Sequence, residues 1–200
     1  DPGRLAAGDY HSLAHLRPNG AVSRFNDAGG LLGTPEGADP MPRKLEAHRE
    51  LRRKLGVESE PPLDGVFPEG GLCFFRTGWD AAASWLGFDA VPEYPGGHLH
   101  LSRLSIEYHR GGRTLLPDPG ILSYEMSTWY GPAGKATRMH STCNVDMLSQ
   151  SDTGARLLRT KTDEQFSVAH GRSESGYCPG RFVWGFSSDG RGTGVYGTPD

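Results

Sequence analysis

The sequence predicts a mainly β, antiparallel layer structure that follows a short segment of helix and loops. Turn-forming residues are abundant, with 29 glycines and 15 prolines among 200 residues. Average proteins contain about 7% glycine and 5% proline. After residue 62, short runs rich in aromatic and branched residues are each bounded by Gly, Pro or Asp, as short strands joined by turns would be. We therefore expect helix and loops in residues 1–62 and β-structure in residues 63–200.

The first part of the chain offers one clear helix signal. Residues 1–40 carry turn signals instead, and we expect them to be loop-like. The predicted helix starts after Asp39, a suitable N-cap, has Pro42 in its first turn and stops at Gly56. Its many charged residues are those of a solvated helix face.

Seven strands are predicted after this helix. They are residues 72–77, 85–90, 101–108, 114–116, 143–148, 165–169 and 181–186. In the third of them, Leu104, Ile106 and Tyr108 alternate with polar residues, which predicts a half-buried strand.

Composition excludes some partners and leaves the redox state open. The formal net charge of −3 gives no basic face for nucleic acid. No apolar run reaches the roughly 18 residues of a membrane span. Cys73, Cys143 and Cys178 could form one disulfide, although three buried thiols are the simpler interpretation.

Histidines and one carboxylate form the strongest chemical pattern. In Gly97-His98-Leu99-His100, a strand would project both imidazoles from the same face. A hairpin ending at Asp118 could return its carboxylate beside them, and His140 precedes another predicted strand. Two or three imidazoles with one carboxylate suit zinc, and other divalent metals could also bind. The alternative is a set of surface or hydrogen-bonded histidines.

Other motif-based functions fit less well. A cupin also places His-x-His on a strand, but its glutamate would follow the second His by four or five residues. Leu104 and Ser105 occupy those positions, and Glu107 comes too late. The chain also has no nucleophile elbow, no dinucleotide-binding glycine motif and no Walker loop.

Several short segments follow one another in a recognisable order over about residues 63–175. They are Gly70-Gly71, Arg76-Thr77-Gly78-Trp79-Asp80, Leu86-Gly87-Phe88-Asp89-Ala90, Gly97-His98-Leu99-His100, Leu115-Leu116-Pro117-Asp118-Pro119-Gly120, Tyr124, His140-Ser141-Thr142 and Val145-Asp146. This ordered set resembles the heparinase II/III-like polysaccharide lyases, and Phe25-Asn26-Asp27 resembles a turn just upstream in such enzymes. Two positions depart from the usual pattern of that family: Ser102 replaces an Asp, and Ser141 replaces an Asn.

This resemblance implies an antiparallel β-sandwich preceded by an (α/α) toroid, with substrate bound between the two. Residues 1–62 would then be the end of the toroid and a linker, and residues 63–200 part of the sandwich. The implied reaction is β-elimination in a uronic-acid polysaccharide, in a periplasmic or secreted enzyme. We expect this chain to be an internal piece of such a lyase with little activity alone.

The resemblance also assigns roles to individual residues. His98 would be catalytic, and His100, Asp118 and His140 would bind zinc. Tyr124 is a second catalytic candidate, although a tyrosine can act as a base only if its pKa falls well below about 10. The candidates for substrate binding are Trp129 and Tyr130, which could stack on sugar rings, and Arg138, which could bind a carboxylate.

A non-catalytic carbohydrate-binding β-sandwich with a structural metal remains the alternative function. A lyase would generate the ultraviolet absorbance of an unsaturated uronate, whereas a binding module would only retain the polysaccharide.

Overall fold

The computed structural model describes residues 2–27, 41–57, 59–93, 98–124, 130–151, 153–174, 176–178, 181–186 and 192–197. It describes the backbone alone at 2–7, 130–132, 178, 181–186 and 192–197.

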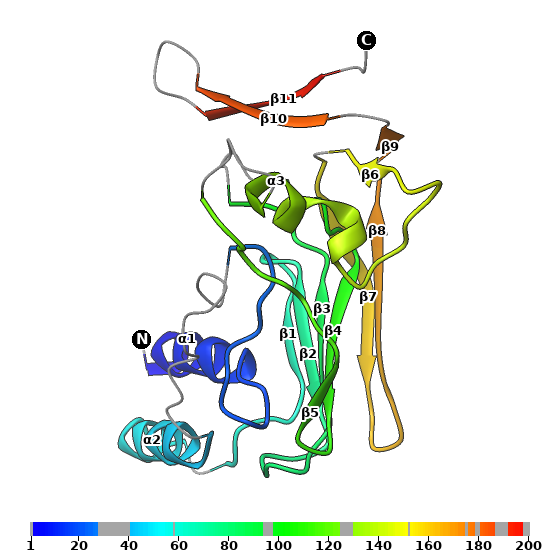
Figure 1. The fold of residues 1–200 in the computed structure, drawn as a ribbon. Helices are drawn as coiled ribbons and strands as arrows, with labels where there is room; N and C mark the ends of the chain where they lie inside the picture. The colour runs from blue at the N-terminus through cyan, green and yellow to red at the C-terminus, as the bar shows by residue number, and fades with distance from the viewer. Residues whose placement is uncertain are drawn as a thin grey trace.

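The described elements are short helices and antiparallel strands (Figure 1). The helices are α1 (Pro2–Ala14), α2 (Met41–Lys54), α3 (Tyr130–Lys135) and the 3-10 helix η1 (Thr137–Met139). The strands are β1 (Gly65–Phe67), β2 (Leu72–Arg76), β3 (Trp85–Asp89), β4 (Ser105–Arg110), β5 (Arg113–Leu116), β6 (Ser149–Gln150), β7 (Ala155–Thr162), β8 (Ser167–Ser173), β9 (Tyr177–Cys178), β10 (Arg181–Phe186) and β11 (Gly192–Gly197). None of the helices in the described ranges is both long and apolar enough to cross a membrane.

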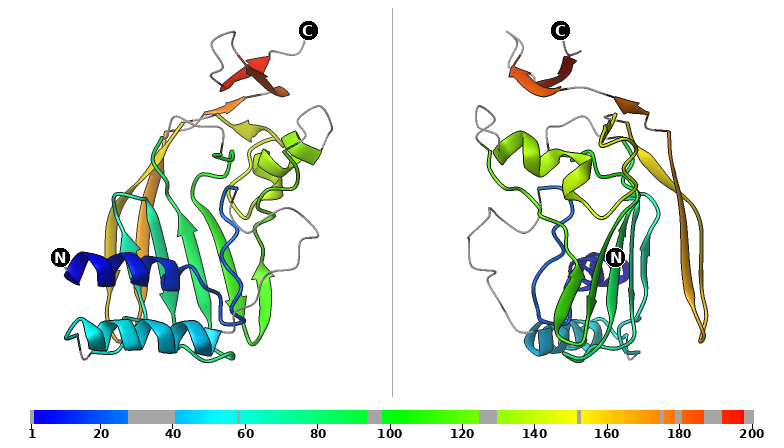
Figure 2. Two further views of the ribbon diagram at one scale, coloured as in Figure 1. Left: turned by 90° about the vertical axis from the view of Figure 1, so that its left-hand side faces the viewer. Right: turned by 45° about the vertical axis from the view of Figure 1, so that its right-hand side comes forward.

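The central layer is a five-stranded antiparallel sheet in the order β1-β2-β3-β4-β5. Helices α1 and α2 lie on one face of this sheet, and the β7–β8 hairpin lies on the opposite face (Figure 2). β8 approaches the sheet closely, because a side chain at Gly171 would meet Leu104 at 2.6 Å and Phe88 at 2.9 Å. The result is a layered β-structure with helices on one side.

The core between the helices and the sheet is built from aromatic side chains. Phe74 and Trp85 are fully buried, with stacked rings 5.7 Å apart. The Trp85 Nε1–H donates to the carbonyl of Ala14 at 3.0 Å, so the end of α1 is tied to the sheet. Phe25, which is 4% exposed, joins the same cluster. Large aromatic side chains bury enough area to hold a layer together despite the modest apolar content.

Most predicted strands overlap observed ones, and three of the predictions are wrong. Residues 2–14 form α1 although turn signals pointed to loop; packing of Leu13 and Leu16 against α2 outweighs that weak local propensity. Residues 143–148 form only an isolated bridge between Val145 and Leu148. Of the two cysteines whose side chains are described, Cys73 is buried and Cys143 is exposed, and both are free, so three buried thiols was also wrong.

The burial pattern of β4 is the reverse of the expected one, because its polar side chains are the buried ones. Its polar residues Ser105, Glu107 and His109 are fully buried, whereas Ile106 and Tyr108 are half-buried. The segment after α1 explains this, because Arg17 reaches Glu107 at 3.2 Å and supplies the charge partner that burial requires.

We expect Gly71→Ala to lower the free energy of unfolding by at least about 2 kcal/mol. Gly71 has a φ of +69°, and a Cβ there would lie 2.2 Å from the carbonyl oxygen of Ala90. Gly70→Ala is the matched control, because its nearest neighbouring atom would be 3.8 Å away. Urea unfolding followed by circular dichroism measures both. Equal stability of the two variants would contradict the described turn.

Candidate active site

The carboxylate of Asp27 is the centre of the site. Its Oδ2 lies 2.7 Å from Nδ1 of His98, and its Oδ1 lies 2.8 Å from Nε2 of His100. The ammonium group of Lys135 donates to Oδ1 at 3.2 Å. Both predicted imidazoles therefore contact the same group, the carboxylate of Asp27, which lies in the segment that follows α1.

A turn in the backbone holds Asp27 in position. Asn26 has a φ of 58°, in the left-handed region that asparagine tolerates better than most residues. Its side-chain oxygen accepts the backbone N–H of His100 at 2.9 Å, and its amide donates to Asp89 at 3.3 Å. The neighbouring Phe25 is anchored in the core. The turn is thus tied both to the core and to the histidine loop.

The histidines lie on a loop and not on a strand. Residues 98–104 precede β4, which begins at Ser105. The backbone N–H of Leu101 donates to the carbonyl of Lys135 at 2.9 Å, and that of Leu104 donates to Asp89 at 2.8 Å. Leu104 adopts a φ of 62°, unusual for a bulky residue, where the loop turns into the strand. These contacts hold the loop although it lacks strand pairing.

The two histidines differ sharply in exposure. The His98 side chain is 72% exposed, whereas that of His100 is completely buried. Burial lowers the pKa of His100 to about 4, so this ring is neutral near pH 7. Burial would raise the pKa of Asp27, but hydrogen bonds from His100 and His98 and the charge of Lys135 outweigh it and hold the pKa at about 2.

These protonation states define the roles of the ring nitrogens. An ionised carboxylate only accepts hydrogen bonds, so the protons lie on Nδ1 of His98 and on Nε2 of His100. In its neutral form, His98 therefore presents an unprotonated Nε2 on an exposed ring. Nδ1 of His100 is left as a buried lone pair, with no hydrogen-bond partner among the described residues.

Asp118 and His140 form a second buried pair beside His100. Oδ2 of Asp118 lies 2.9 Å from Nδ1 of His140, and both side chains are fully buried. The backbone N–H of Gly120 donates to Asp118 at 3.0 Å, and Nε2 of His140 lies 3.0 Å from the carbonyl of Gly134. The rings of His100 and His140 are 5.3 Å apart. The three residues predicted to bind metal are therefore neighbours.

The donor atoms of this trio suit a zinc ion. Two imidazoles and a carboxylate are present, all are buried, and Nδ1 of His100 has a lone pair that no described residue uses. Within the part of the chain that the structure describes, no group of three or more His, Cys, Asp or Glu side chains is spaced to hold a metal ion as it stands. The trio fits zinc in chemistry and burial, and binding would have to replace the hydrogen bond between Asp118 and His140.

Tyr124 lies beside Asp27 and is 59% exposed. Burial, the negative charge of Asp27 and a hydrogen bond with Asp27 all raise the pKa of its phenol. In this environment Tyr124 keeps its proton, so it can donate one but does not meet the requirement for a base.

The three predicted substrate-binding residues are not brought into contact with this cluster by any described interaction. Arg138 is exposed on η1. Trp129 lies outside the described residues, and for Tyr130 only the backbone at the start of α3 is described.

Asp27 and Lys135 were not predicted as site residues. The Asn26-Asp27 turn was a usable signal, since asparagine favours the left-handed turn that presents the next side chain. Lys135 gave no signal, because a single lysine after a glycine is usually solvated. It is instead 3% exposed and paired with Asp27.

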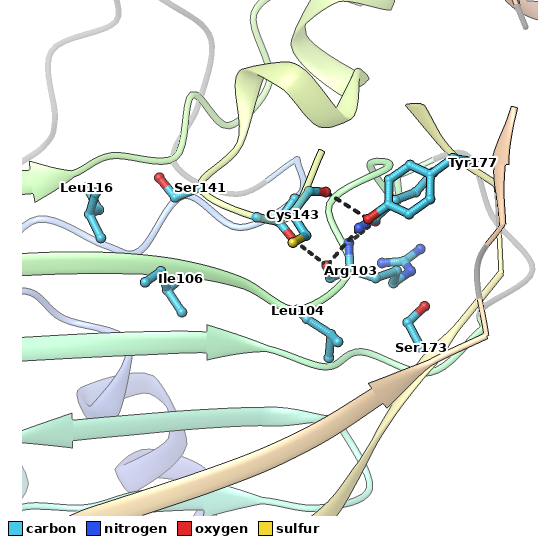
Figure 3. Close-up of a pocket in the computed structure, with 10 residues that line it drawn as sticks. Arg103, Leu104, Ile106, Leu116, Ser141, Cys143, Ser173 and Tyr177 are labelled. Atoms are coloured by element: carbon cyan, nitrogen blue, oxygen red, sulfur yellow. Dashed lines mark hydrogen bonds between the residues drawn. The ribbon is translucent and has the colours of Figure 1, made fainter. Parts of the chain in front are cut away.

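A separate pocket of about 790 Å³ lies between β4, β5 and the segment 141–143 (Figure 3). Leu104, Ile106 and Leu116 form its apolar wall, and the Tyr177 hydroxyl donates to the carbonyl of Cys143 at 2.9 Å. None of the predicted site residues lines this pocket. The cluster of Asp27, His98 and His100 therefore lies outside this pocket.

Together these features define a β-sandwich domain with a histidine–carboxylate cluster beyond the end of its main sheet. A family model described as "Heparinase II/III-like, C-terminal" matches residues 60–177, and the chain belongs to this family. No protein of curated function matches it in sequence.

Solved structures share the fold. A heparan sulfate lyase, HepC from Pedobacter heparinus, is 20% identical with a TM-score of 0.62, over 84% of this chain and 27% of that chain. The heparinase III-BT4657 gene product is 18% identical with a TM-score of 0.62, over 82% of this chain and 27% of that chain. At these identities the likeness shows the heparinase-type C-terminal β-sandwich, and the chain spans 27% of either relative's length.

Proposed function

We propose that this protein is a polysaccharide lyase that cleaves a uronic-acid-containing polysaccharide by β-elimination. One observation carries the proposal: in a domain of the heparinase II/III-like family, the exposed imidazole of His98 is held at Nδ1 by the ionised carboxylate of Asp27. Such a polymer lies outside cells, and we propose a periplasmic or secreted location on that ground.

The proposed reaction moves one proton off carbon and one onto oxygen. The C5–H bond of the uronate breaks, its electron pair forms the C4–C5 double bond, and the C4–O bond breaks. A base takes the C5 proton, an acid protonates the departing oxygen, and no water is added. His98 can accept or relay a proton at Nε2, and Asp27 stabilises the imidazolium that results. Tyr124, which keeps its proton, suits the acid role.

The substrate carboxylate also has to be neutralised, because the proton next to a carboxylate is barely acidic. Arg138 is an exposed cation on η1 that could bind the carboxylate and supply that charge. Trp129 and Tyr130 remain candidates for stacking on sugar rings.

The test is absorbance of the unsaturated product on a panel of alginate, heparan sulfate and chondroitin sulfate. The assay should use the longest natural polypeptide that contains residues 1–200, since relatives of this fold are longer. A rise in absorbance supports the lyase. Retention on a polysaccharide affinity gel without any rise favours the carbohydrate-binding module instead.

For the metal, we propose that His100, Asp118 and His140 hold zinc or another divalent cation. The support is the buried donor set and the unused Nδ1 of His100. A bound metal would supply a fixed charge that keeps the loop carrying His98 in place.

We expect His100→Ala to lower the metal content from about one ion per chain to below about 0.1. Elemental analysis of the purified protein measures this directly. His48→Ala is the control, because His48 is also buried but lies on α2 and pairs with Asp9 of α1. Metal content that is unchanged in His100→Ala, or absent from the wild type, would contradict the metal site.

A further inference from the structure

The carboxylate of Asp27 is hydrogen-bonded to two histidines that differ in exposure and in expected role. Oδ2 of Asp27 contacts the exposed His98, and Oδ1 contacts the buried His100. Asp27 is itself only 9% exposed, and it lies 71 residues before His98 in the chain. The link therefore joins the segment after α1 to the histidine loop.

The contact with His98 selects one tautomer of the ring. A neutral imidazole in water prefers its proton on Nε2. Beside a carboxylate at 2.7 Å from Nδ1, the proton has to lie on Nδ1, because the carboxylate can only accept. The lone pair of Nε2 is then on the outer edge of a ring that is 72% exposed. Without this contact, the outer nitrogen would mostly carry a proton and could not accept one.

No other described contact can do this for His98. Its hydrogen bond to Asp27 is the only one that the described residues provide for this side chain. The position of the carboxylate does not depend on His98, because Lys135 and His100 both contact its other oxygen. An acceptor fixed by other contacts beside an exposed imidazole ring is the arrangement of a histidine and its orienting residue.

We propose that Asp27 is the positioning residue of His98, holding the ring as the Nδ1–H tautomer so that Nε2 faces the substrate. This inference rests on the proposed lyase function for its consequence, but the tautomer can be tested without it. Asp27 acts through His98 and is not itself in contact with reacting atoms.

The experiment compares wild type with Asp27→Asn and Asp27→Ala by long-range ¹H–¹⁵N correlation of the His98 ring, at a pH at which the ring is neutral. Asp27→Asn preserves the shape of the side chain but has only one acceptor oxygen, so it cannot satisfy both histidines. Glu50→Gln on the exposed surface of α2 is the control for loss of a carboxylate. We expect Nδ1–H in the wild type and the control, and mostly Nε2–H in Asp27→Ala.

The kinetic arm uses the same proteins on whichever polysaccharide the wild type cleaves. We expect kcat to fall at least about tenfold in both Asp27 variants, with KM changed less than about threefold. The inference is overturned if wild-type His98 carries its proton on Nε2, if Asp27→Ala leaves the tautomer unchanged, or if the tautomer shifts without loss of kcat. If the wild type cleaves nothing, the lyase function fails, while the spectra still decide whether Asp27 sets the tautomer. If Asp27→Ala does not fold, Asp27→Asn decides alone: His100 and Lys135 both donate to Oδ1, so the amide oxygen takes that place, the NH2 group faces His98, and Nε2–H is the tautomer expected there.

Discussion

Replacing His98 with alanine is expected to lower kcat about 10²- to 10⁴-fold, the usual loss when a general acid–base group is removed. The ring of His98 is 72% exposed and hydrogen-bonded to Asp27, so it contributes little to packing. The variant should therefore fold as the wild type does. Initial rates of absorbance increase measure the loss, and thermal unfolding verifies the fold.

His170→Ala is the matched control for that experiment. His170 is also an exposed histidine, but it lies on β8, on the opposite face of the sheet from α1 and α2. Its replacement should leave kcat within about twofold of the wild type. A His98→Ala variant that retains full kcat would remove His98 from the mechanism, whatever the outcome for His170.

Replacing Glu107 with alanine is expected to lower the free energy of unfolding by about 3–5 kcal/mol, as breaking one side of a buried ion pair does. Glu107 is fully buried, 3.2 Å from the guanidinium of Arg17, which is itself only 6% exposed. Its other oxygen accepts the backbone N–H of Arg24 at 3.0 Å. The variant would leave the buried Arg17 without its carboxylate.

Urea unfolding of Glu107→Ala tests this value. Glu50→Ala is the control, since Glu50 and Lys54 form an exposed pair on α2 whose loss should cost less than about 1 kcal/mol. A double replacement, Arg17→Met with Glu107→Leu, should restore part of the lost stability, because it removes both charges. Equal stability of Glu107→Ala and Glu50→Ala would contradict the described orientation of β4.

The family and four of the five strands of the central sheet could be predicted from the sequence, because both depend on local signals; β1 was missed, and β4 begins at Ser105 and not at residue 101. Runs such as 72–76 and 85–89 combine aromatic residues with flanking turns, and β2 and β3 begin where these runs begin. The motifs around His98 and Asp118 keep their order along the chain, which identified the family later matched over residues 60–177.

What sequence patterns missed depends on contacts between distant segments. Asp27 and Lys135 are 108 residues apart, and no local pattern links them. The alternation of apolar and polar residues in β4 could be seen in the sequence. Which of its two faces is buried depends on the segment around Arg17, which brings a positive charge to Glu107 on the polar face. Helix α1 likewise depends on packing against α2 and the sheet, because its own sequence contains Gly3 and Gly8.

We propose that the cluster around His98 carries out β-elimination. Mass spectrometry of the products from an acidic polysaccharide tests it most directly, with the wild type and His98→Ala compared side by side. We expect products with an unsaturated non-reducing end, lighter by one water than hydrolysis products, and at least about 100-fold less product from His98→Ala. Saturated products that have gained water, or equal product from both proteins, would contradict it.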